Sequence, residues 1–344
     1  MATEKKLRYI KFNIGVLHLE LTSRCNALCP MCGRTTGMDG AVEGGEVILK
    51  KRDDVELLDT DPQLLANMIE EMKPFVPNHV FINGNFGDPI MYPHLLEVVK
   101  MYKDAGVPQV TLSTNGSVHK TDWWEKLASI MRKPDKVIFA IDGLEDTNHL
   151  YRVNTNFNKI MENAKAFINA GGRARWDFIV FKHNEHQVEE AQQLSNDLGF
   201  ETFQFKKTGR FFSTARHKGK ESHQAVNKKG EETQKLEKPK DKYVNKALHK
   251  EKELVAKHGS MENYYKQVKI DCKVKKEKSI FITAEGMLMP CCWVGGQMYK
   301  WYWPPKHSDV WPFIDKQDLD VKNNSLKEVM AGPFLKAIEN SWQD

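Results

Sequence analysis

The chain has 344 residues, of which 40% are hydrophobic and 28% are charged, and its net charge is +5. These values exclude a disordered chain and predict a globular protein with a sizeable core and a second, smaller unit. A charge of +5 is too weak to indicate nucleic-acid binding. No stretch has the roughly 18 to 20 apolar residues of a membrane span, and the first residues lack a signal-peptide pattern. We therefore expect a cytoplasmic protein with no membrane contact.

Short apolar runs alternate with longer amphipathic runs between residues 15 and 206. They predict strands over 15–21, 79–83, 109–113, 136–142, 175–181 and 202–206, and helices over 62–73, 93–105, 121–131, 157–170 and 185–198. Several strand runs are continuously apolar, as in parallel strands that are covered on both faces. This order predicts an α/β fold, a partial (β/α)6 TIM-like barrel, whose functional site lies at the carboxyl ends of the strands.

Unusual polar or glycine-rich stretches follow the first four predicted strands. They are the cysteine run 25–32, NGNFGDP (83–89), STNG (113–116) and DGLED (142–146). Because the carboxyl ends of parallel strands share one rim of a barrel, these stretches predict a single site.

The six cysteines form two groups of three. Cys25, Cys29 and Cys32 make a C-x3-C-x2-C run after the first strand, and Cys272, Cys291 and Cys292 lie near the other end. In a reducing compartment, metal ligation is a commoner use of such thiols than disulfides. A [4Fe–4S] cluster that is held by three thiolates keeps one iron open to another ligand. A structural zinc site with a distant fourth ligand, or buried thiols, are the alternatives.

With the cysteine run in this place, residues 12 to 210 resemble the core domain of the radical S-adenosylmethionine (radical SAM) superfamily. The resemblance implies a [4Fe–4S] cluster on Cys25, Cys29 and Cys32, whose open iron chelates the amino and carboxylate groups of S-adenosylmethionine (AdoMet). An electron from the cluster then cleaves AdoMet to methionine and a 5′-deoxyadenosyl radical, which abstracts hydrogen from the substrate. It also implies a low-potential electron donor such as flavodoxin or ferredoxin. No general acid or base is assigned, because that role requires the geometry of the substrate.

The same resemblance suggests residues for AdoMet. The stretch GNFGDP is similar to the family's Gly-Gly-Glu-Pro, with Phe86 and Asp88 as departures, and its carbonyl groups would receive the ammonium group. Arg152 occupies the position of an arginine that pairs with the methionine carboxylate, whereas Ala140 stands where relatives often have a serine. A turn without a ligand and a surface ion pair are the alternatives for the glycine stretch and for Arg152. The expected cofactor-binding residues are Gly84, Asn85, Gly87, Asp88, Ser113, Asn115, Asp142 and Arg152.

Composition divides the chain into a core over 1–212, a charged segment over 213–265 and a C-terminal unit over 266–344. Residues 215–253 are dense in Lys, Glu and His and nearly free of large apolar residues. They predict a helical or mobile connector that builds no core. The alternative is a basic lid that recruits an acidic peptide or a phosphate-bearing substrate.

In the C-terminal unit, IFITAEGMLMPCC predicts a β-hairpin that turns at Glu285 and Gly286 and brings Cys272 back against Cys291 and Cys292. This unit resembles a truncated SPASM or twitch auxiliary-cluster domain, and residues 323–342 resemble the helix that follows there. The resemblance implies at most one auxiliary [4Fe–4S] cluster, held by these three cysteines. Its fourth ligand is open, and the alternatives are zinc or packed thiols. The candidate histidines are His183, His186, His217 and His307.

Three hypotheses for function follow. The first is a radical SAM enzyme of oxidoreductase or maturase type that modifies a residue of a peptide or protein. The second applies the same chemistry to a small molecule such as a sugar, cyclitol or nucleotide, which is oxidised or epimerised. The third is a non-enzymatic, metal-stabilised binding protein.

Overall fold

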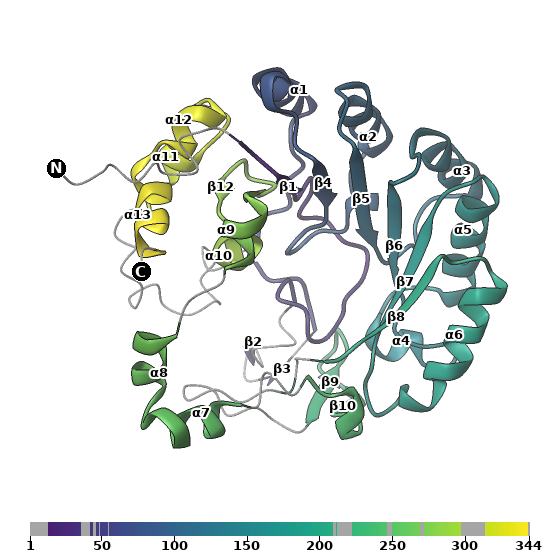
Figure 1. Ribbon diagram of the computed structural model, residues 1–344. Helices are drawn as coiled ribbons and strands as arrows, with labels where there is room; N and C mark the ends of the chain where they lie inside the picture. The colour runs from purple at the N-terminus through teal and green to yellow at the C-terminus, as the bar shows by residue number, and fades with distance from the viewer. Residues whose placement is uncertain are drawn as a thin grey trace.

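The computed structural model describes residues 13–35, 42–43, 46–47, 49–53, 55–208, 211, 222–245, 250–268, 272–296 and 314–342. An eight-stranded sheet with the order β12-β11-β1-β4-β5-β6-β7-β8 forms its centre (Figure 1). Six of these strands are the predicted ones, namely β1 (Val16–Leu19), β4 (His79–Ile82), β5 (Gln109–Thr114), β6 (Lys136–Ala140), β7 (Ala174–Ile179) and β8 (Thr202–Lys206). Neighbours among these six pair in parallel, so the predicted partial barrel is confirmed.

The predicted helices cover the outer face of the curved sheet (Figure 1). They are α1 (Pro62–Met72), α2 (Leu95–Asp104), α3 (Thr121–Ile130), α5 (Phe157–Asn169) and α6 (Val188–Asp197), and a single turn, α4 (Asn148–Tyr151), follows β6. Asp61 starts α1, because its side chain accepts the Gln63 N–H at 2.9 Å and Pro62 occupies the first turn. No helix in the described part of the chain is long and apolar enough to cross a membrane.

Alternation along β7 shows how the sheet separates its two faces. Ala174, Trp176 and Phe178 are at most 1% exposed and belong to the core beneath the helices. Arg175 and Asp177 alternate with them and therefore face the concave inner side of the barrel. The sheet thus has an apolar outer face and a polar inner face at this strand.

The predicted C-terminal hairpin is confirmed and extends the barrel sheet. Strand β11 (Ser279–Ile282) pairs in parallel with β1, and β12 (Leu288–Met289) pairs antiparallel with β11. Gly286 turns the hairpin with φ +88°, a conformation that favours glycine. The short helices α9 (Lys273–Glu277) and α10 (Cys292–Gly296) flank the hairpin in the sequence. Cys272 directly precedes α9, and Cys291 and Cys292 lie at the start of α10.

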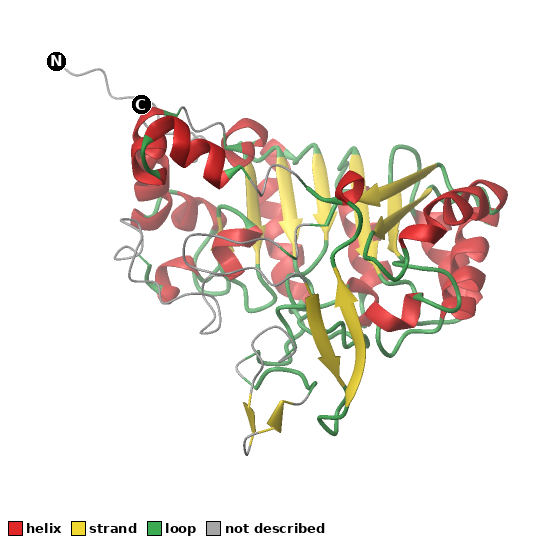
Figure 2. Cartoon of the chain, turned by 90° about the horizontal axis from the view of Figure 1, so that it is seen from below, coloured by secondary structure: helices red, strands yellow, loops and turns green. Residues whose placement is uncertain are grey.

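The prediction that the charged segment builds no core is wrong for residues 222–237. They form an antiparallel pair, β9 (Ser222–Val226) and β10 (Glu232–Glu237), which lies below the sheet (Figure 2). Leu236 is fully buried in an apolar cluster with Cys29, Met31 and Tyr151. Few apolar residues suffice here, because the hairpin packs on residues of the barrel. The helical expectation holds for α7 (Glu251–His258) and α8 (Met261–Gln267).

The C-terminal residues form two helices, so the single helix expected over 323–342 is wrong. They are α12 (Leu326–Met330) and α13 (Pro333–Ser341), which follow the short α11 (Lys316–Leu319). The break lies at Gly332 and Pro333, because proline cannot continue a helix from its preceding turn. Ser325 and Glu328 form a capping box at the start of α12. A small hairpin of β2 (Val42–Glu43) and β3 (Glu46–Val47) completes the described elements.

Candidate functional site

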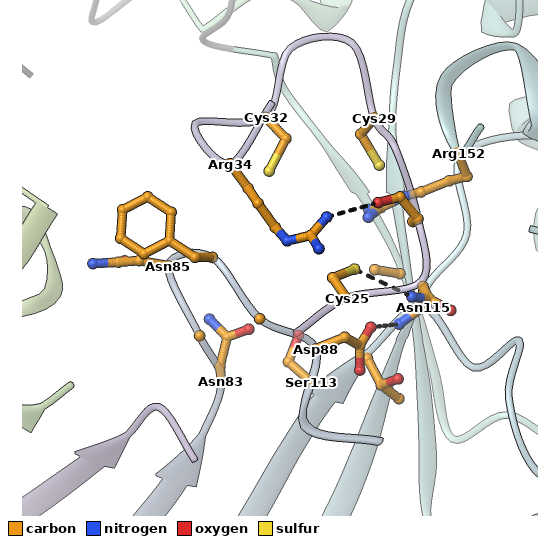
Figure 3. A pocket seen from close by; sticks show the side chains of 16 residues that line it. Cys25, Cys29, Cys32, Arg34, Asn83, Asn85, Asp88, Ser113, Asn115 and Arg152 are labelled. Atoms are coloured by element: carbon orange, nitrogen blue, oxygen red, sulfur yellow. Dashed lines mark hydrogen bonds between the residues drawn. The ribbon is translucent and has the colours of Figure 1, made fainter. Parts of the chain in front are cut away.

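The first three cysteines lie on the loop that leaves the carboxyl end of β1. Their sulfur atoms point toward one space (Figure 3), and all three line the same cavity. Internal hydrogen bonds hold the loop, since the Thr35 hydroxyl donates to the carbonyl oxygens of Cys29 and Cys32 at 3.0 Å each. A compact loop thus places the thiols of Cys25, Cys29 and Cys32 around one cavity.

Cys25 lies in a buried environment at this cavity. Burial, and then Asp88 and the other two thiols, raise the pKa of Cys25 above its usual value. The Asn115 side-chain amide donates to Cys25 Sγ at 3.9 Å and to Asn26 Oδ1 at 2.9 Å. Asn115, which was expected among the cofactor-binding residues, therefore contacts a cysteine sulfur directly.

The glycine-rich stretch after β4 forms the opposite wall of the cavity. A Cβ atom on Gly87 would lie 1.7 Å from the Thr22 carbonyl oxygen, so only glycine fits there. Asp88 accepts the backbone N–H of Asn115 at 2.7 Å and thereby joins the loops after β4 and β5. Burial raises the pKa of Asp88. The departure from the family's glutamate therefore serves to position a neighbouring loop.

Arg152 and Asp142 form a buried ion pair beside the thiols. Arg152 Nε donates to Asp142 Oδ2 at 2.6 Å, and Asp142 Oδ1 accepts the Ile179 N–H at 2.6 Å. Burial works against the charge of Arg152, but Asp142 and Cys29 outweigh it and raise the pKa of the guanidinium. Asp142 thus fixes the position of the Arg152 guanidinium at the wall of the cavity.

The structure brings most of the predicted site residues together and separates one. Asp142 supports Arg152 and does not line the cavity. The other predicted residues of the first site line it, namely Cys25, Cys29, Cys32, Gly84, Asn85, Gly87, Asp88, Ser113, Asn115 and Arg152. Ala140 lines it as well, so no serine hydroxyl is supplied at that position.

The sequence analysis missed two ionisable residues at this site. Arg34 is 6% exposed, lines the cavity and donates to the carbonyl oxygens of Ser23 and Ala27 at 3.3 and 3.4 Å. Glu20 is buried below the glycine-rich stretch, where its Oε1 accepts the Phe86 N–H at 2.7 Å. Their only sequence signal is position, because Arg34 closely follows the third cysteine and Glu20 is the last residue but one of the first predicted strand.

The second cysteine group is joined to the first site by a hydrogen bond. The Asn85 side-chain amide donates to the Cys292 carbonyl oxygen at 2.8 Å. Burial raises the pKa of Cys292 to about 11, with Cys291 as the next cause, and burial also raises the pKa of Cys291. Cys292 therefore lies beside the glycine-rich stretch, and all three cysteines pack against the same hydrophobic core.

Two of the histidines suggested as ligands of this second group are excluded. His183 and His186 precede α6, which lies on the opposite side of the molecule from α10 (Figure 1). Burial lowers the pKa of His183 to about 4, and its ring stacks on Phe181. His217 and His307 lie outside the described residues.

Replacing Gly87 with alanine is expected to destabilise the fold, because the new methyl group would collide with the Thr22 carbonyl. The expected loss in the free energy of unfolding is about 1–3 kcal/mol, as for other overpacked sites. Gly296→Ala is the matched control, since among the residues that the structure describes its Cβ would meet only Asn85 Nδ2, at 3.7 Å. Urea unfolding of both variants measures the difference. Equal midpoints would show that the loop adapts without cost.

Glu20 is expected to make stability depend on pH. Burial raises its pKa from 4.5 to about 7. The folded chain therefore holds a proton that the unfolded chain has lost between pH 4.5 and 7, and the free energy of unfolding falls as the pH rises through this window. Glu20→Gln removes this dependence, which amounts to about 3 kcal/mol. Unfolding at pH 5 and pH 7.5 measures it, and parallel pH profiles for both proteins would contradict the assignment.

The donor set at the first site fits a [4Fe–4S] cluster. Three thiols around one cavity can hold three irons and leave the fourth open, and glycines allow close approach of a ligand to the backbone. Among the residues that the structure describes, no three His, Cys, Asp or Glu side chains form a site for a single metal ion. For the second group, the described residues supply three thiols and no assigned fourth ligand.

Comparison with known proteins supports this interpretation of the first site. A family model described as the radical SAM superfamily matches residues 19–194. A probable GTP 3′,8-cyclase of Saccharolobus islandicus is 28% identical over 187 residues, which cover 53% of each chain. The tungsten-containing aldehyde ferredoxin oxidoreductase cofactor-modifying protein of Pyrococcus furiosus is 27% identical over 128 residues, or 37% of this chain and 31% of that protein. The chain thus spans about half or less of these relatives.

Solved structures show the same fold. SuiB of Streptococcus suis bound to the precursor peptide SuiA superposes with a TM-score of 0.56 at 13% identity, covering 95% of this chain and 67% of SuiB. The enzyme anSMEcpe with bound AdoMet and the Cp18Cys peptide gives a TM-score of 0.53 at 13% identity, covering 96% of this chain and 83% of that one. The family model covers half of the chain, and the matched region contains Cys25, Cys29 and Cys32, which line the cavity described above. The chain therefore belongs to the radical SAM superfamily.

Proposed function

We propose that this chain cleaves AdoMet reductively and uses the resulting radical to abstract hydrogen from a residue of a peptide or protein. The observation that carries the proposal is the single cavity that collects Cys25, Cys29 and Cys32 with the glycine-rich stretch and Arg152. When bound, the cluster supplies the electron that cleaves AdoMet to methionine and a 5′-deoxyadenosyl radical.

The chain's own residues bind and orient the two groups. Cys25, Cys29 and Cys32 hold three irons as thiolates. The carbonyl groups around Gly84 and Gly87 receive the ammonium group of AdoMet. Arg152 binds its carboxylate, because a guanidinium that is fixed by a buried aspartate has donors left for a second anion. Ser113 and Asn115 line the remaining wall, and Asn115 also donates to Cys25 Sγ.

The peptide substrate is favoured by the solved structures with similar folds, because two of them contain bound peptides. A second candidate is a nucleotide substrate, since curated relatives are described as probable GTP 3′,8-cyclases. We propose that the chain works in the cytoplasm with a flavodoxin or ferredoxin as electron donor. An auxiliary [4Fe–4S] cluster on Cys272, Cys291 and Cys292 is part of the proposal.

The test is the formation of 5′-deoxyadenosine by anaerobically reconstituted protein with AdoMet and dithionite, measured by liquid chromatography and mass spectrometry. We expect slow formation without substrate, and faster formation with a peptide pool than with GTP. Faster formation with GTP alone would favour the nucleotide. No product from protein with an intact first cluster would favour a non-enzymatic binding protein.

A further inference from the structure

The inner face of β7 and β8 carries a cluster of charges outside the cavity described above. Arg175 contacts Asp177 through two nitrogens, with Nε 2.8 Å from Oδ1 and Nη2 2.9 Å from Oδ2. From β8, Lys206 Nζ lies 3.1 Å from Asp177 Oδ2 and donates to Gln204 Oε1 at 3.2 Å. Two cations therefore share one carboxylate, and the cluster has a net charge of +1.

Donors remain available in this cluster. A guanidinium has five N–H groups and an ammonium has three. In the described part of the chain, Asp177 occupies one edge of Arg175, and Asp177 and Gln204 take two protons of Lys206. The other edge of Arg175 and one proton of Lys206 are left for a further acceptor. The side chains of Arg175 and Lys206 are 23% and 38% exposed, so a solute can reach them.

The register of the sheet places this cluster beside the cofactor cavity. Ala140, which lines the cavity, pairs with Asp177, and Asp177 pairs with Gln204 on the next strand. Because neighbouring strands lie about 5 Å apart, the cluster begins roughly 5–10 Å from that cavity wall. A substrate that is held here could present a neighbouring atom to the cofactor.

The inner face of β1, β4 and β11 has the opposite character. The ring of His18 lies 4.9 Å from that of Phe81 and 4.7 Å from that of Phe281. Burial lowers the pKa of His18 to about 4, so these three rings carry no charge at neutral pH. The interior of the barrel thus offers an aromatic cluster on one side and a cationic group on the other.

We infer that Arg175 and Lys206 form a subsite for a carboxylate of the substrate, and that Asp177 positions both cations. A net charge of +1 and two sets of free donors match a monoanion with two oxygens. A triphosphate carries several negative charges, which this cluster does not balance. The inference rests on the proposed function, because it identifies an acidic side chain of the peptide as the group that is bound.

The test is residue-specific acetylation of the reconstituted protein with bound AdoMet and without reductant. N-acetylglutamate amide is the probe, and N-acetylglutamine amide is its uncharged counterpart. We expect the carboxylate probe to protect Lys206 at about tenfold lower concentration than the amide probe, because hydrogen bonds between charged groups are stronger. Lys100, which pairs with Asp104 on α2, is the internal control and should show no protection.

Two variants and two further probes make the outcome decisive. Arg175→Gln should abolish the difference between the probes at Lys206, whereas Arg173→Gln, which removes a neighbouring pair with Glu201, should preserve it. Equal protection by both probes, or none, would overturn the inference. Better protection by inorganic phosphate or GTP would overturn it in favour of a phosphate subsite. Because no AdoMet is cleaved in this experiment, its failure is separate from failure to form 5′-deoxyadenosine.

Discussion

A chain in which Cys25, Cys29 and Cys32 are all alanine is expected to form no 5′-deoxyadenosine and to retain about four irons, the content of one [4Fe–4S] cluster. The loss follows because these thiols line the cavity that also holds the AdoMet residues. The retained iron follows from the proposed cluster on Cys272, Cys291 and Cys292. Iron and sulfide analysis with electron paramagnetic resonance of anaerobically reconstituted protein measures both.

The matched control replaces Cys272, Cys291 and Cys292 with alanine. This variant is expected to keep one cluster. It should still cleave AdoMet at the slow rate that is expected in the absence of substrate. If the first variant holds no iron, the second cysteine group is a packing unit without a cluster. We would then expect a redox-neutral reaction instead of an oxidation of the substrate. If the first variant still cleaves AdoMet, the assignment of the first site is wrong.

Arg152→Met is expected to weaken AdoMet binding by about ten- to hundredfold, because a charge-assisted contact to the cofactor carboxylate is lost. It also leaves Asp142, which is fully buried, without its counter-charge. Breaking one partner out of a buried pair costs about 3–5 kcal/mol of stability. Equilibrium binding of AdoMet to reconstituted protein and urea unfolding measure the two effects.

A double variant separates binding from stability. Adding Asp142→Asn to Arg152→Met removes the unpaired charge while its oxygen can still accept the Ile179 N–H, so stability should recover in part. AdoMet affinity should stay low. Arg173→Met, which breaks a more exposed pair with Glu201, should change stability by about 1 kcal/mol or less. Full AdoMet affinity in the double variant would remove Arg152 from the cofactor site.

The parts of the fold that were predictable have strong local patterns. The six barrel strands are short runs that are either apolar or alternate apolar and polar residues, and each predicted helix has an apolar face. The first site was predictable for the same reason, because its cysteines, glycines and Arg152 follow strands whose ends share one rim. Local sequence patterns were therefore enough to predict the sheet, the helices that cover it and the position of the site at the carboxyl ends of the strands.

The parts that were not predictable depend on contacts between distant residues. Strand β10 has one fully buried apolar residue, Leu236, whose partners Cys29 and Met31 lie some two hundred residues earlier. The position of Glu20 under Phe86 arises only when the end of β1 meets the loop after β4. The apolar periodicity of one segment does not indicate which distant segment it will contact.

The pairing of β11 with β1 has a consequence for how the chain is made. Leu19 pairs with Ile282, so one edge of β1 has no strand partner until the C-terminal hairpin has been synthesised. At about 5–20 residues per second, that edge waits roughly 10 to 50 seconds after β1 emerges from the ribosome. An unpaired strand edge beside three thiols is prone to wrong pairing. Chaperone binding to this edge during translation would protect the nascent chain over this interval.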